Sequence, residues 1–336
     1  MRSAHRATAL GIVAIVCLLL GTACFAGVAR ASVDYLSASF VDAKYGWIAG
    51  IDSMRTTDVW RTTDGGVTWK KAGSGVAAGG SVGWVAFVSR TAGVWGNGGF
   101  LRTGDGGGSW EPVAVSDLGI VNEACFATPA VGWAASTYGN SAAGGALAKT
   151  TDGGLTWVTQ KSLPGDDGSG GFSRVSSPSV QQCYAFKWGD EGGVWATSDG
   201  GAVWTRRPLP AIAGGAYAYY WDIDFPAAGT GWAVGDGGTI VKTVNGGGTW
   251  ATQSSGVSAQ LTAVDFVSAS VGFAVGKGGL ILRTRDGGTH WVKLSSGTQK
   301  RLSAVCFVSA SRGWVVGTSG VRLRTANGGR TWLGQH

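Results

Sequence analysis

The chain has 336 residues, of which 44% are hydrophobic, 14% are charged and 60 are glycines. The glycines follow no three-residue period, which excludes collagen, and 17 tryptophans with 11 phenylalanines exclude a disordered linker. Residues 1–31 hold three basic residues and no acid, so the remaining chain has 24 basic and 20 acidic residues and a net charge of +4. This small excess does not indicate nucleic acid as a partner.

The first 31 residues have the pattern of an export signal. Arg2 and Arg6 precede an apolar run over residues 7–29, and the tripeptide ARA before Ser32 is an A-x-A cleavage site. The run is also long enough to be an uncleaved membrane anchor, and lipidation at Cys24 is a third alternative. All three alternatives predict a body outside the cytoplasm, whether secreted, periplasmic or anchored in the membrane.

An eight-residue motif, TTDGGVTW at residues 62–69, occurs seven times along the chain. Its copies end at Trp69, Trp110, Trp157, Trp204, Trp250, Trp291 and Trp332, which are 41 to 47 residues apart. The clearest repeat contains four short β-rich runs, at 261–267, 272–276, 280–284 and 289–294, separated by Ser, Gly and Asp-Gly-Gly. A period in the forties with four strands is typical of a propeller blade.

A second marker repeats with the motif: a Phe six residues before a Gly, as in Phe266 and Gly272. Only the fourth repeat lacks it, and Pro178 there predicts the most irregular blade. We therefore expect an all-β fold, one seven-bladed β-propeller with four antiparallel strands per blade over residues 33–336. Because the chain begins with a first strand and ends with a fourth, we expect blade packing to close the ring.

The motif is expected to lock the turn between the third and fourth strands of each blade. Its acidic side chain accepts hydrogen bonds from the turn, the two glycines allow positive φ, and the tryptophan buries a large ring. The acid becomes Asn in two copies, and an amide can still hold the turn whereas a catalytic acid would be lost. The predicted structural residues at this position are Asp64, Asp105, Asp152, Asp199, Asn245, Asp286 and Asn327.

The D-G-G-x-T-W turn resembles the Asp-box, or bacterial neuraminidase repeat, a structural hairpin of many propellers. The longer stretches GWAVGDGGTIVKTVNGGGTW from Gly231 and GFAVGKGGLILRTRDGGTHW from Gly272 resemble the photosystem II stability and assembly factor family. That resemblance covers almost the whole chain after the signal. It implies an exported, non-catalytic propeller that binds a protein, which in photosynthetic organisms is a newly made reaction-centre subunit.

Additional loop residues suggest one binding surface. Long loops start at Ser136, Lys161 and Pro208, and all three are expected on the face opposite the motif turns. They would carry a patch of aromatic side chains: Tyr138, Phe172, Tyr217, Tyr219, Tyr220 and Trp221. The alternative is that residues 219–221 begin the inner strand of the fifth blade and belong to the core.

A basic residue precedes the first motif threonine in six of the seven repeats, with Ala196 as the exception. These residues form a second candidate for partner binding: Arg61, Arg102, Lys149, Lys242, Arg283 and Arg324. The alternative is that their stems cover aromatic surface between blades while the charges reach solvent. The assembly factors have an arginine-rich patch that has no residue-by-residue match here. Further candidates for it are Arg206, Arg207 and Arg322.

Enzyme functions are poorly supported by the sequence. The resemblance to sialidases ends at the Asp-box, because their RIP tripeptide is absent, and xyloglucanases use two such propellers where this chain has one. Asp224 and Asp265 occupy equivalent positions in adjacent blades and could meet near the channel as a carboxylate pair, although solvated structural acids are the simpler interpretation. Cys125, Cys183 and Cys306 lack metal-ligand or disulfide spacing, and we expect buried apolar roles for Cys125 and Cys306, which occupy the same place in two repeats.

We therefore predict no enzyme, no catalytic residue, no cofactor and no metal. The expected function is that of a monomeric, exported scaffold that binds a protein partner, such as a membrane protein. The alternative is a propeller at the cell surface that binds or hydrolyses carbohydrate, with the aromatic patch stacking on sugar rings.

Overall fold

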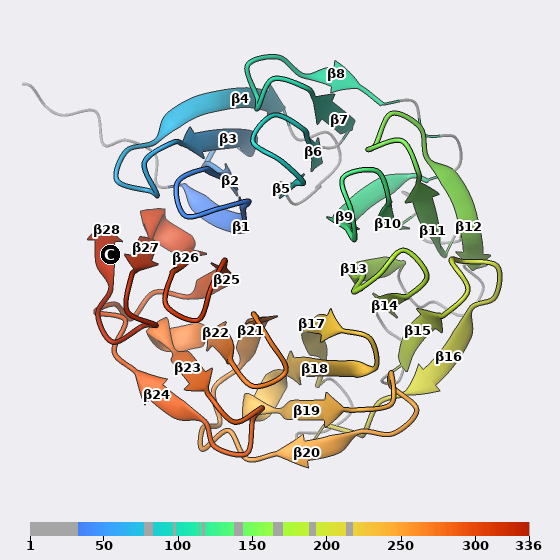
Figure 1. The fold of residues 1–336 in the computed structure, drawn as a ribbon. Coiled ribbons are helices and arrows are strands. Elements are labelled where there is room, and N and C mark those ends of the chain that lie inside the picture. The colour runs from blue at the N-terminus through green and yellow to red at the C-terminus, as the bar shows by residue number, and fades with distance from the viewer. Residues whose placement is uncertain are drawn as a thin grey trace, which may run out of the picture. The chain divides into compact units, whose positions relative to one another are not determined.

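The computed structural model describes residues 33–76, 83–96, 99–113, 115, 118–137, 144–163, 171–187, 193–212 and 218–335. These residues form seven antiparallel sheets, each of four consecutive strands. The sheets stand around a central channel, with the first strand of each sheet innermost and the fourth at the periphery (Figure 1). The predicted seven-bladed β-propeller is confirmed.

The strands of the first four blades are as follows. Blade one contains β1 (Asp34–Phe40), β2 (Gly46–Ile51), β3 (Thr56–Thr62) and β4 (Lys70–Val76). Blade two contains β5 (Trp84–Phe87), β6 (Gly93–Gly96), β7 (Phe100–Thr103) and β8 (Glu111–Pro112). Blade three contains β9 (Ile120–Phe126), β10 (Gly132–Thr137), β11 (Gly145–Thr150) and β12 (Val158–Leu163). Blade four contains β13 (Phe172–Ser176), β14 (Cys183–Lys187), β15 (Gly193–Thr197) and β16 (Thr205–Pro208).

The last three blades each add a short 3-10 turn between the second and third strands. Blade five contains β17 (Tyr220–Ala227), β18 (Thr230–Gly235), η1 (Asp236–Gly238), β19 (Ile240–Thr243) and β20 (Ala251–Gln253). Blade six contains β21 (Leu261–Phe266), β22 (Gly272–Gly276), η2 (Lys277–Gly279), β23 (Ile281–Thr284) and β24 (Val292–Leu294). Blade seven contains β25 (Leu302–Phe307), β26 (Gly313–Gly317), η3 (Thr318–Gly320), β27 (Arg322–Thr325) and β28 (Leu333–Gln335).

The repeated Phe and Gly form one packing unit in six of the seven blades. A Cβ atom on Gly46 would lie 2.2 Å from Cδ1 of Phe40, because the phenyl ring covers the glycine backbone. The edge of the motif tryptophan meets the same ring, with the centroids of Phe40 and Trp69 6.0 Å apart. The six-residue spacing of Phe and Gly therefore reflects a contact in which the phenyl ring leaves no room for a side chain at the glycine.

The same phenylalanines also join neighbouring blades. Phe87 of blade two stacks on Trp47 of blade one at a centroid distance of 3.6 Å. Equivalent stacks, at 3.5 to 3.6 Å, join four further pairs: Phe225 with Tyr184, Phe266 with Trp232, Phe307 with Phe273, and Phe40 with Trp314. Each ring is thus held between its own blade and the preceding one, which makes the seams between blades aromatic.

The ring closes without a shared strand, because blades one and seven each consist of four consecutive strands. Trp314 stacks on Phe40 and donates its indole N–H to the carbonyl of Gly65 at 2.9 Å. On the other face, Gly320 donates its backbone N–H to Val33 at 2.8 Å. Packing and hydrogen bonding between the blades therefore close the ring, as expected.

Blade four is not the most irregular blade. Pro178 lies in the turn between β13 and β14, outside the strand pairing, so it removes no ladder hydrogen bond. The shortest strands are in blade two, where β8 has only two residues and ends at Pro112. Trp133 of blade three, which has no Phe to stack on in blade four, instead meets Trp204 edge to face at 5.5 Å.

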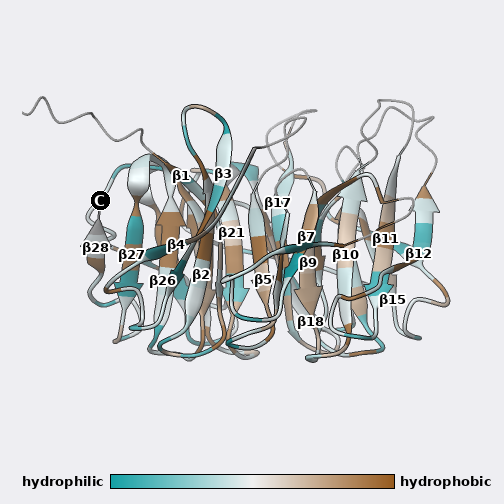
Figure 2. Ribbon diagram, turned by 90° about the horizontal axis from the view of Figure 1, so that it is seen from above, coloured by the Kyte–Doolittle hydropathy of each residue, from teal (hydrophilic) through white to brown (hydrophobic). Residues whose placement is uncertain are grey.

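The strands run along the channel axis, so the turns gather at two ends (Figure 2). The motif turn between the third and fourth strands lies beside the turn between the first and second strands. In all seven blades the first motif glycine donates its N–H to that neighbouring turn, as Gly65 does to the carbonyl of Lys44 at 2.9 Å. We call this end the Asp-box face; the other end, with η1, η2 and η3, is the opposite face.

Residues 1–31, the predicted export signal, lie outside the described residues. Across the described part of the chain, no helix has the length and apolar character needed to cross a membrane.

Candidate functional site

The Asp-box turns use the hydrogen-bonding capacity of their acids internally. The Asp64 carboxylate accepts the hydroxyl of Thr62 at 2.8 Å and the backbone N–H groups of Val67 and Thr68, both at 3.0 Å. Gly65 and Gly66 have φ values of 73° and 83°. Although burial alone would raise the pKa of Asp64, the bonds from Thr68, Thr62 and Val67 lower it to about 2.

The two asparagine copies keep the same geometry. The Asn245 Oδ1 atom accepts the Thr243 hydroxyl at 3.0 Å and the Thr249 N–H at 2.9 Å, while its Nδ2 donates to the Thr249 hydroxyl at 3.0 Å. The turn therefore needs an acceptor atom at this position and does not need a charge. This arrangement supports a structural role for the Asp-box side chains and leaves them unsuited to acid or base chemistry.

Four of the basic residues before the motif threonine tie their blade to the next. Lys149 donates its ammonium to the carbonyl of Gly200 in the following Asp-box at 2.8 Å, and its charge lies 4.8 Å from the Trp133 ring. Equivalent bonds run from Arg102 to Gly153, from Lys242 to Gly287 and from Arg283 to Gly328. Arg61 instead lies 5.7 Å over the Trp47 ring, and Arg324 lines a small pocket beside Trp314.

Blade four shows how this tie is replaced where the cation is missing. Ala196 stands at the basic position, and Arg207 on the neighbouring strand β16 donates to the carbonyl of Gly246 in blade five. The alternative expectation is that the stems of the basic residues cover aromatic surface between blades while their charges reach solvent. The first part of this expectation agrees with the contacts to the tryptophan rings. Their charges, however, bond to carbonyl groups at the seam.

A cluster of arginines lies on the Asp-box face of blades six and seven. Arg285, Arg312 and Arg330 are exposed, and Arg283 and Arg324 are half-buried. A Cβ atom on Gly328 would lie 3.8 Å from Nη1 of Arg283 and 3.7 Å from Nη2 of Arg285, so both guanidinium groups approach this turn. Burial and the charges of Arg285 and Arg330 lower the pKa of Arg283. Among the described residues, no carboxylate forms an ion pair with any of the five.

A groove crosses this arginine cluster. It is lined by Arg285, Arg330, Asn327 and the turn residues 309–311. Because blade seven has Asn327 at its Asp-box, no motif carboxylate of that blade offsets the arginines. Sequence reasoning singled out only Arg283 and Arg324 here, since Arg285, Arg312 and Arg330 fall at turn positions that differ from blade to blade.

The aromatic loop patch is only partly at the surface. Tyr138 and Tyr217 lie outside the described residues. Tyr220 is buried, as the core alternative for residues 219–221 expected, and Tyr219 is half-buried; Phe172 is buried as well. Trp221 and Tyr220 both line a cavity at the channel mouth on the opposite face, together with Arg174 and Arg301. The indole N–H of Trp221 donates to Asp236 at 2.9 Å, and Arg301 lies 5.9 Å over its ring.

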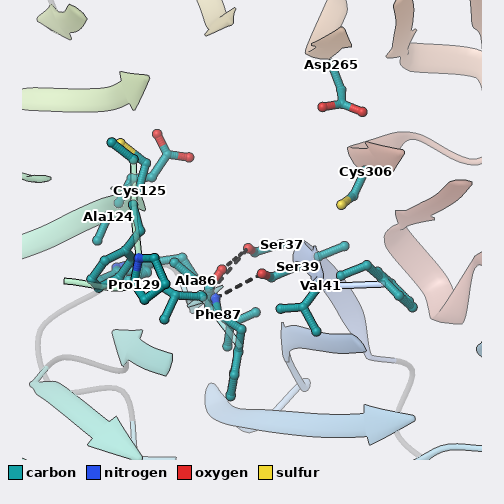
Figure 3. A pocket seen from close by; sticks show the side chains of 18 of the residues that line it. Ser37, Ser39, Val41, Ala86, Phe87, Ala124, Cys125, Pro129, Asp265 and Cys306 are labelled. Carbon is teal, nitrogen blue, oxygen red and sulfur yellow. Dashed lines mark hydrogen bonds between the residues drawn. The ribbon is translucent and has the colours of Figure 1, made fainter. Parts of the chain in front are cut away.

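The central channel holds an unexpected group of carboxylates: Glu123, Asp222, Asp224 and Asp265. Asp224 and Asp265 lie on adjacent inner strands, as the sequence suggested, where they are half-buried and accept backbone N–H groups of the next blade. Burial raises the pKa of Asp265 to about 7, and burial together with the Asp265 charge raises that of Asp224 well above its ordinary value. Figure 3 shows Asp265 pointing into the cavity of about 580 Å³ at the Asp-box end of the channel.

Two cysteines expected in the core lie in this channel instead. Cys125 and Cys306 line the same cavity (Figure 3), because their positions on the inner strands point toward the axis. Burial, then the charges of Asp265 and Asp224, raise the pKa of Cys306 to about 12, so the thiol is a poor nucleophile. Of the three cysteines in the described residues, only Cys183, for which no such role was predicted, is fully buried. In the described part of the chain, no three His, Cys, Asp or Glu side chains are grouped as metal ligands.

Comparison with known proteins supplies the family context. Residues 212–299, which contain the strands of blades five and six, match the family model described as photosynthesis system II assembly factor YCF48. A solved YCF48 bound to a D1 peptide superposes with a TM-score of 0.69, covering 89% of this chain and 95% of that one at 19% identity. The chain is a propeller with the fold of YCF48, and blades five and six match the model of that family.

Two further solved structures show how widely this fold is shared. YCF48 from Cyanidioschyzon merolae gives a TM-score of 0.67 at 20% identity, covering 88% of this chain and 96% of that one. The GH74 xyloglucanase from Xanthomonas campestris gives 0.63 at 14% identity, covering 89% of this chain but 53% of the enzyme. Because the sequence identities are 20% or lower, these matches show a shared fold alone. No curated protein matches this chain in sequence.

Proposed function

We propose that this YCF48-like propeller is a non-catalytic, exported scaffold that binds an acidic segment of a partner protein. The family match over blades five and six and the likeness to a propeller solved with a bound D1 peptide support a role in protein binding. The expected partner is a membrane protein during its assembly. Export rests on the pattern of residues 1–31, and a mature chain beginning at Ser32 would test it by mass spectrometry.

The arginine cluster of blades six and seven is the observation that carries this proposal. Exposed guanidinium groups without acidic partners retain their attraction for carboxylates, and Arg285 and Arg330 line a groove that can receive an extended chain. The acids elsewhere are already engaged: the Asp-box carboxylates bond within their turns, and the channel carboxylates accept backbone N–H groups. This distribution favours recognition over catalysis.

Charge reversal in the groove tests the proposal. A labelled acidic peptide and its Glu→Gln counterpart would be titrated against the full chain, the double variant Arg285→Glu with Arg330→Glu, and a control. The control, Arg55→Glu with Lys300→Glu, makes the same charge change at two exposed positions away from the groove. We expect the acidic peptide to bind better than its neutral counterpart, and the groove variant alone to weaken it by about tenfold or more.

An equal loss of affinity for the acidic peptide in both double variants, or equal binding of the acidic and neutral peptides, would contradict recognition at the groove. Capture of a partner from solubilised membranes extends the test, because Arg283→Glu with Arg324→Glu should also reduce capture if the cluster acts as a unit. Light scattering would check the expectation that the scaffold is a monomer.

Carbohydrate binding is the second candidate function. It is favoured by the indole of Trp221 at the mouth of the channel and by the fold shared with a xyloglucanase. Glycan-array binding that is abolished by Trp221→Ala, and unaffected by the groove variants, would support this function and contradict the first.

A further inference from the structure

The inner strands of the propeller are joined by side chains of the preceding blade. Each inner strand pairs with its own sheet on one edge only, so N–H groups on the other edge need acceptors. Ser39 of blade one accepts the N–H of Phe87 in blade two at 3.0 Å (Figure 3). At the equivalent position, Asp224 accepts the N–H of Phe266 at 2.8 Å, and Asp265 accepts that of Phe307 at 2.7 Å.

A second layer repeats this arrangement two residues earlier on three of the inner strands, β1, β9 and β17. Glu123 accepts the N–H of Val175 at 2.7 Å, and Asp222 accepts the N–H of Val264 at 2.9 Å. The seam between blades three and four, and those joining blades five, six and seven, are therefore bonded by carboxylates. The seam between blades one and two is bonded by serine hydroxyls, since Ser37 contacts Val85 in this layer.

The seven inner strands give the channel an excess of acidic groups. Four of these strands contribute carboxylates or thiols: Glu123, Asp222, Asp224, Asp265, Cys125 and Cys306. The cation of the inner strands is Arg174, on β13. On β1 the corresponding side chains are serines, and on β5 they are Trp84 and Ala86. The Arg174 Nε atom is 3.6 Å from Asp222, whose side chain is 16% exposed. Asp34 and Arg301 lie farther out, at the mouth.

Full ionisation of these acids is unfavourable in the channel. Burial raises the pKa of Glu123 to about 7, with Arg174 opposing the shift and the charges of Asp222 and Asp224 adding to it. Burial likewise raises the pKa of Asp222 despite the nearby Arg174. One arginine, Arg174, offers a single positive charge against four carboxylates that lie half-buried in the channel.

We propose that the carboxylate seams of the channel are a pH-sensitive fastening, held tight while the acids share protons and loosened when all four ionise. A protonated carboxyl still offers its carbonyl oxygen to the backbone N–H of the next blade, and it no longer repels its neighbours. The unfolded chain has ordinary carboxyl groups, so folding retains protons that unfolding releases. The stabilisation is therefore complete below about pH 4 and is lost as the pH rises through about 7.

Amide hydrogen exchange of the full chain tests this proposal, because the chain contains its own control seam. Between pH 6 and 8.5, after correction for the intrinsic exchange rate, we expect protection of the Phe266 and Phe307 amides to fall by about tenfold or more. Protection of the Phe87 amide, which is bonded to a serine, should fall much less. An equal fall at all three amides, or none, would overturn the proposal.

Substituting the acceptor side chain of one seam for that of another provides matched variants. Asp224→Ser with Asp265→Ser copies the seam of blade one and should remove the pH dependence of the Phe266 and Phe307 amides. The reciprocal Ser39→Asp should confer pH dependence on the Phe87 amide. Unchanged pH dependence in both variants would contradict the proposal.

Infrared spectroscopy of the unmodified chain does not depend on whether the variants fold. A carbonyl band of protonated carboxyl groups should be present at pH 6 and absent at pH 8.5. Absence of this band at pH 6 would overturn the proposal.

Discussion

Phe40 of β1 stacks on Trp314 of β26 with ring centroids 3.6 Å apart and an interplanar angle of 6°. The two residues are 274 positions apart in sequence, and they come from the first and last blades. At the seam between blades one and two, the rings of Phe87 and Trp47 have the same centroid distance, 3.6 Å, and an interplanar angle of 3°. The seam that closes the ring thus repeats the contact of a seam within the chain.

We expect this equivalence to appear in stability measurements. Phe40→Ala and Phe87→Ala each remove a buried ring, and each should lower the free energy of unfolding by about 3–5 kcal/mol. Urea-induced unfolding monitored by tryptophan fluorescence would measure both losses. If Phe40→Ala costs less than half as much as Phe87→Ala, the closing seam contributes less than its geometry indicates.

The Asp-box acids should be replaceable by asparagine. Asp64→Asn keeps the acceptor atom that Asn245 uses in blade five, so we expect little change in unfolding free energy. Asp64→Ala leaves the N–H groups of Val67 and Thr68 without this acceptor and should cost about 1–2 kcal/mol. Thermal unfolding of the two variants compares them directly; a larger cost for Asn than for Ala would show that charge matters at this turn.

Stability should also decline in acid because of the same turns. Burial opposes the shift, but bonds from Thr156 and Thr150 lower the pKa of Asp152 to about 2, as in Asp64. A carboxyl whose pKa is lower in the folded chain contributes stability above its unfolded pKa, near 4, and loses it as the pH falls through about 2. Melting temperatures from pH 5 to 2 should fall, and Asp64→Asn with Asp152→Asn should reduce the slope. An unchanged slope would assign acid unfolding to other groups.

Arg207 should carry the tie between blades four and five. Arg207→Ala removes the donor to the Gly246 carbonyl and should cost about 1–2 kcal/mol of unfolding free energy. Ala196→Lys in that background restores a cation at the position that Lys149 and Lys242 occupy, and we expect it to recover at least half of the loss. Failure of this rescue would show that the two positions do not serve the same seam.

The sequence alone determined the number of blades, the order of their strands and the role of the motif turns. These features depend on neighbours in the chain: the Asp-box bonds span four residues, and Phe40 covers a glycine six residues away. Predicted strand bounds erred where the turn extends into the strand, as in blade six, where residues 289–291 belong to the turn and β24 begins at Val292. Local hydrogen bonding repeats with the sequence, so it can be read from one repeat.

Only the tertiary structure decided which residues meet around the ring. Glu123 and Val175 are separated by 52 residues, and Arg283, Arg285 and Arg330 come from two blades. No single repeat indicates that acids of blades three, five and six share one channel, or that the arginines of blades six and seven lack acidic partners. These properties arise because closing the ring brings one position of each blade to a common axis or face, where charges from distant segments set one another's environment.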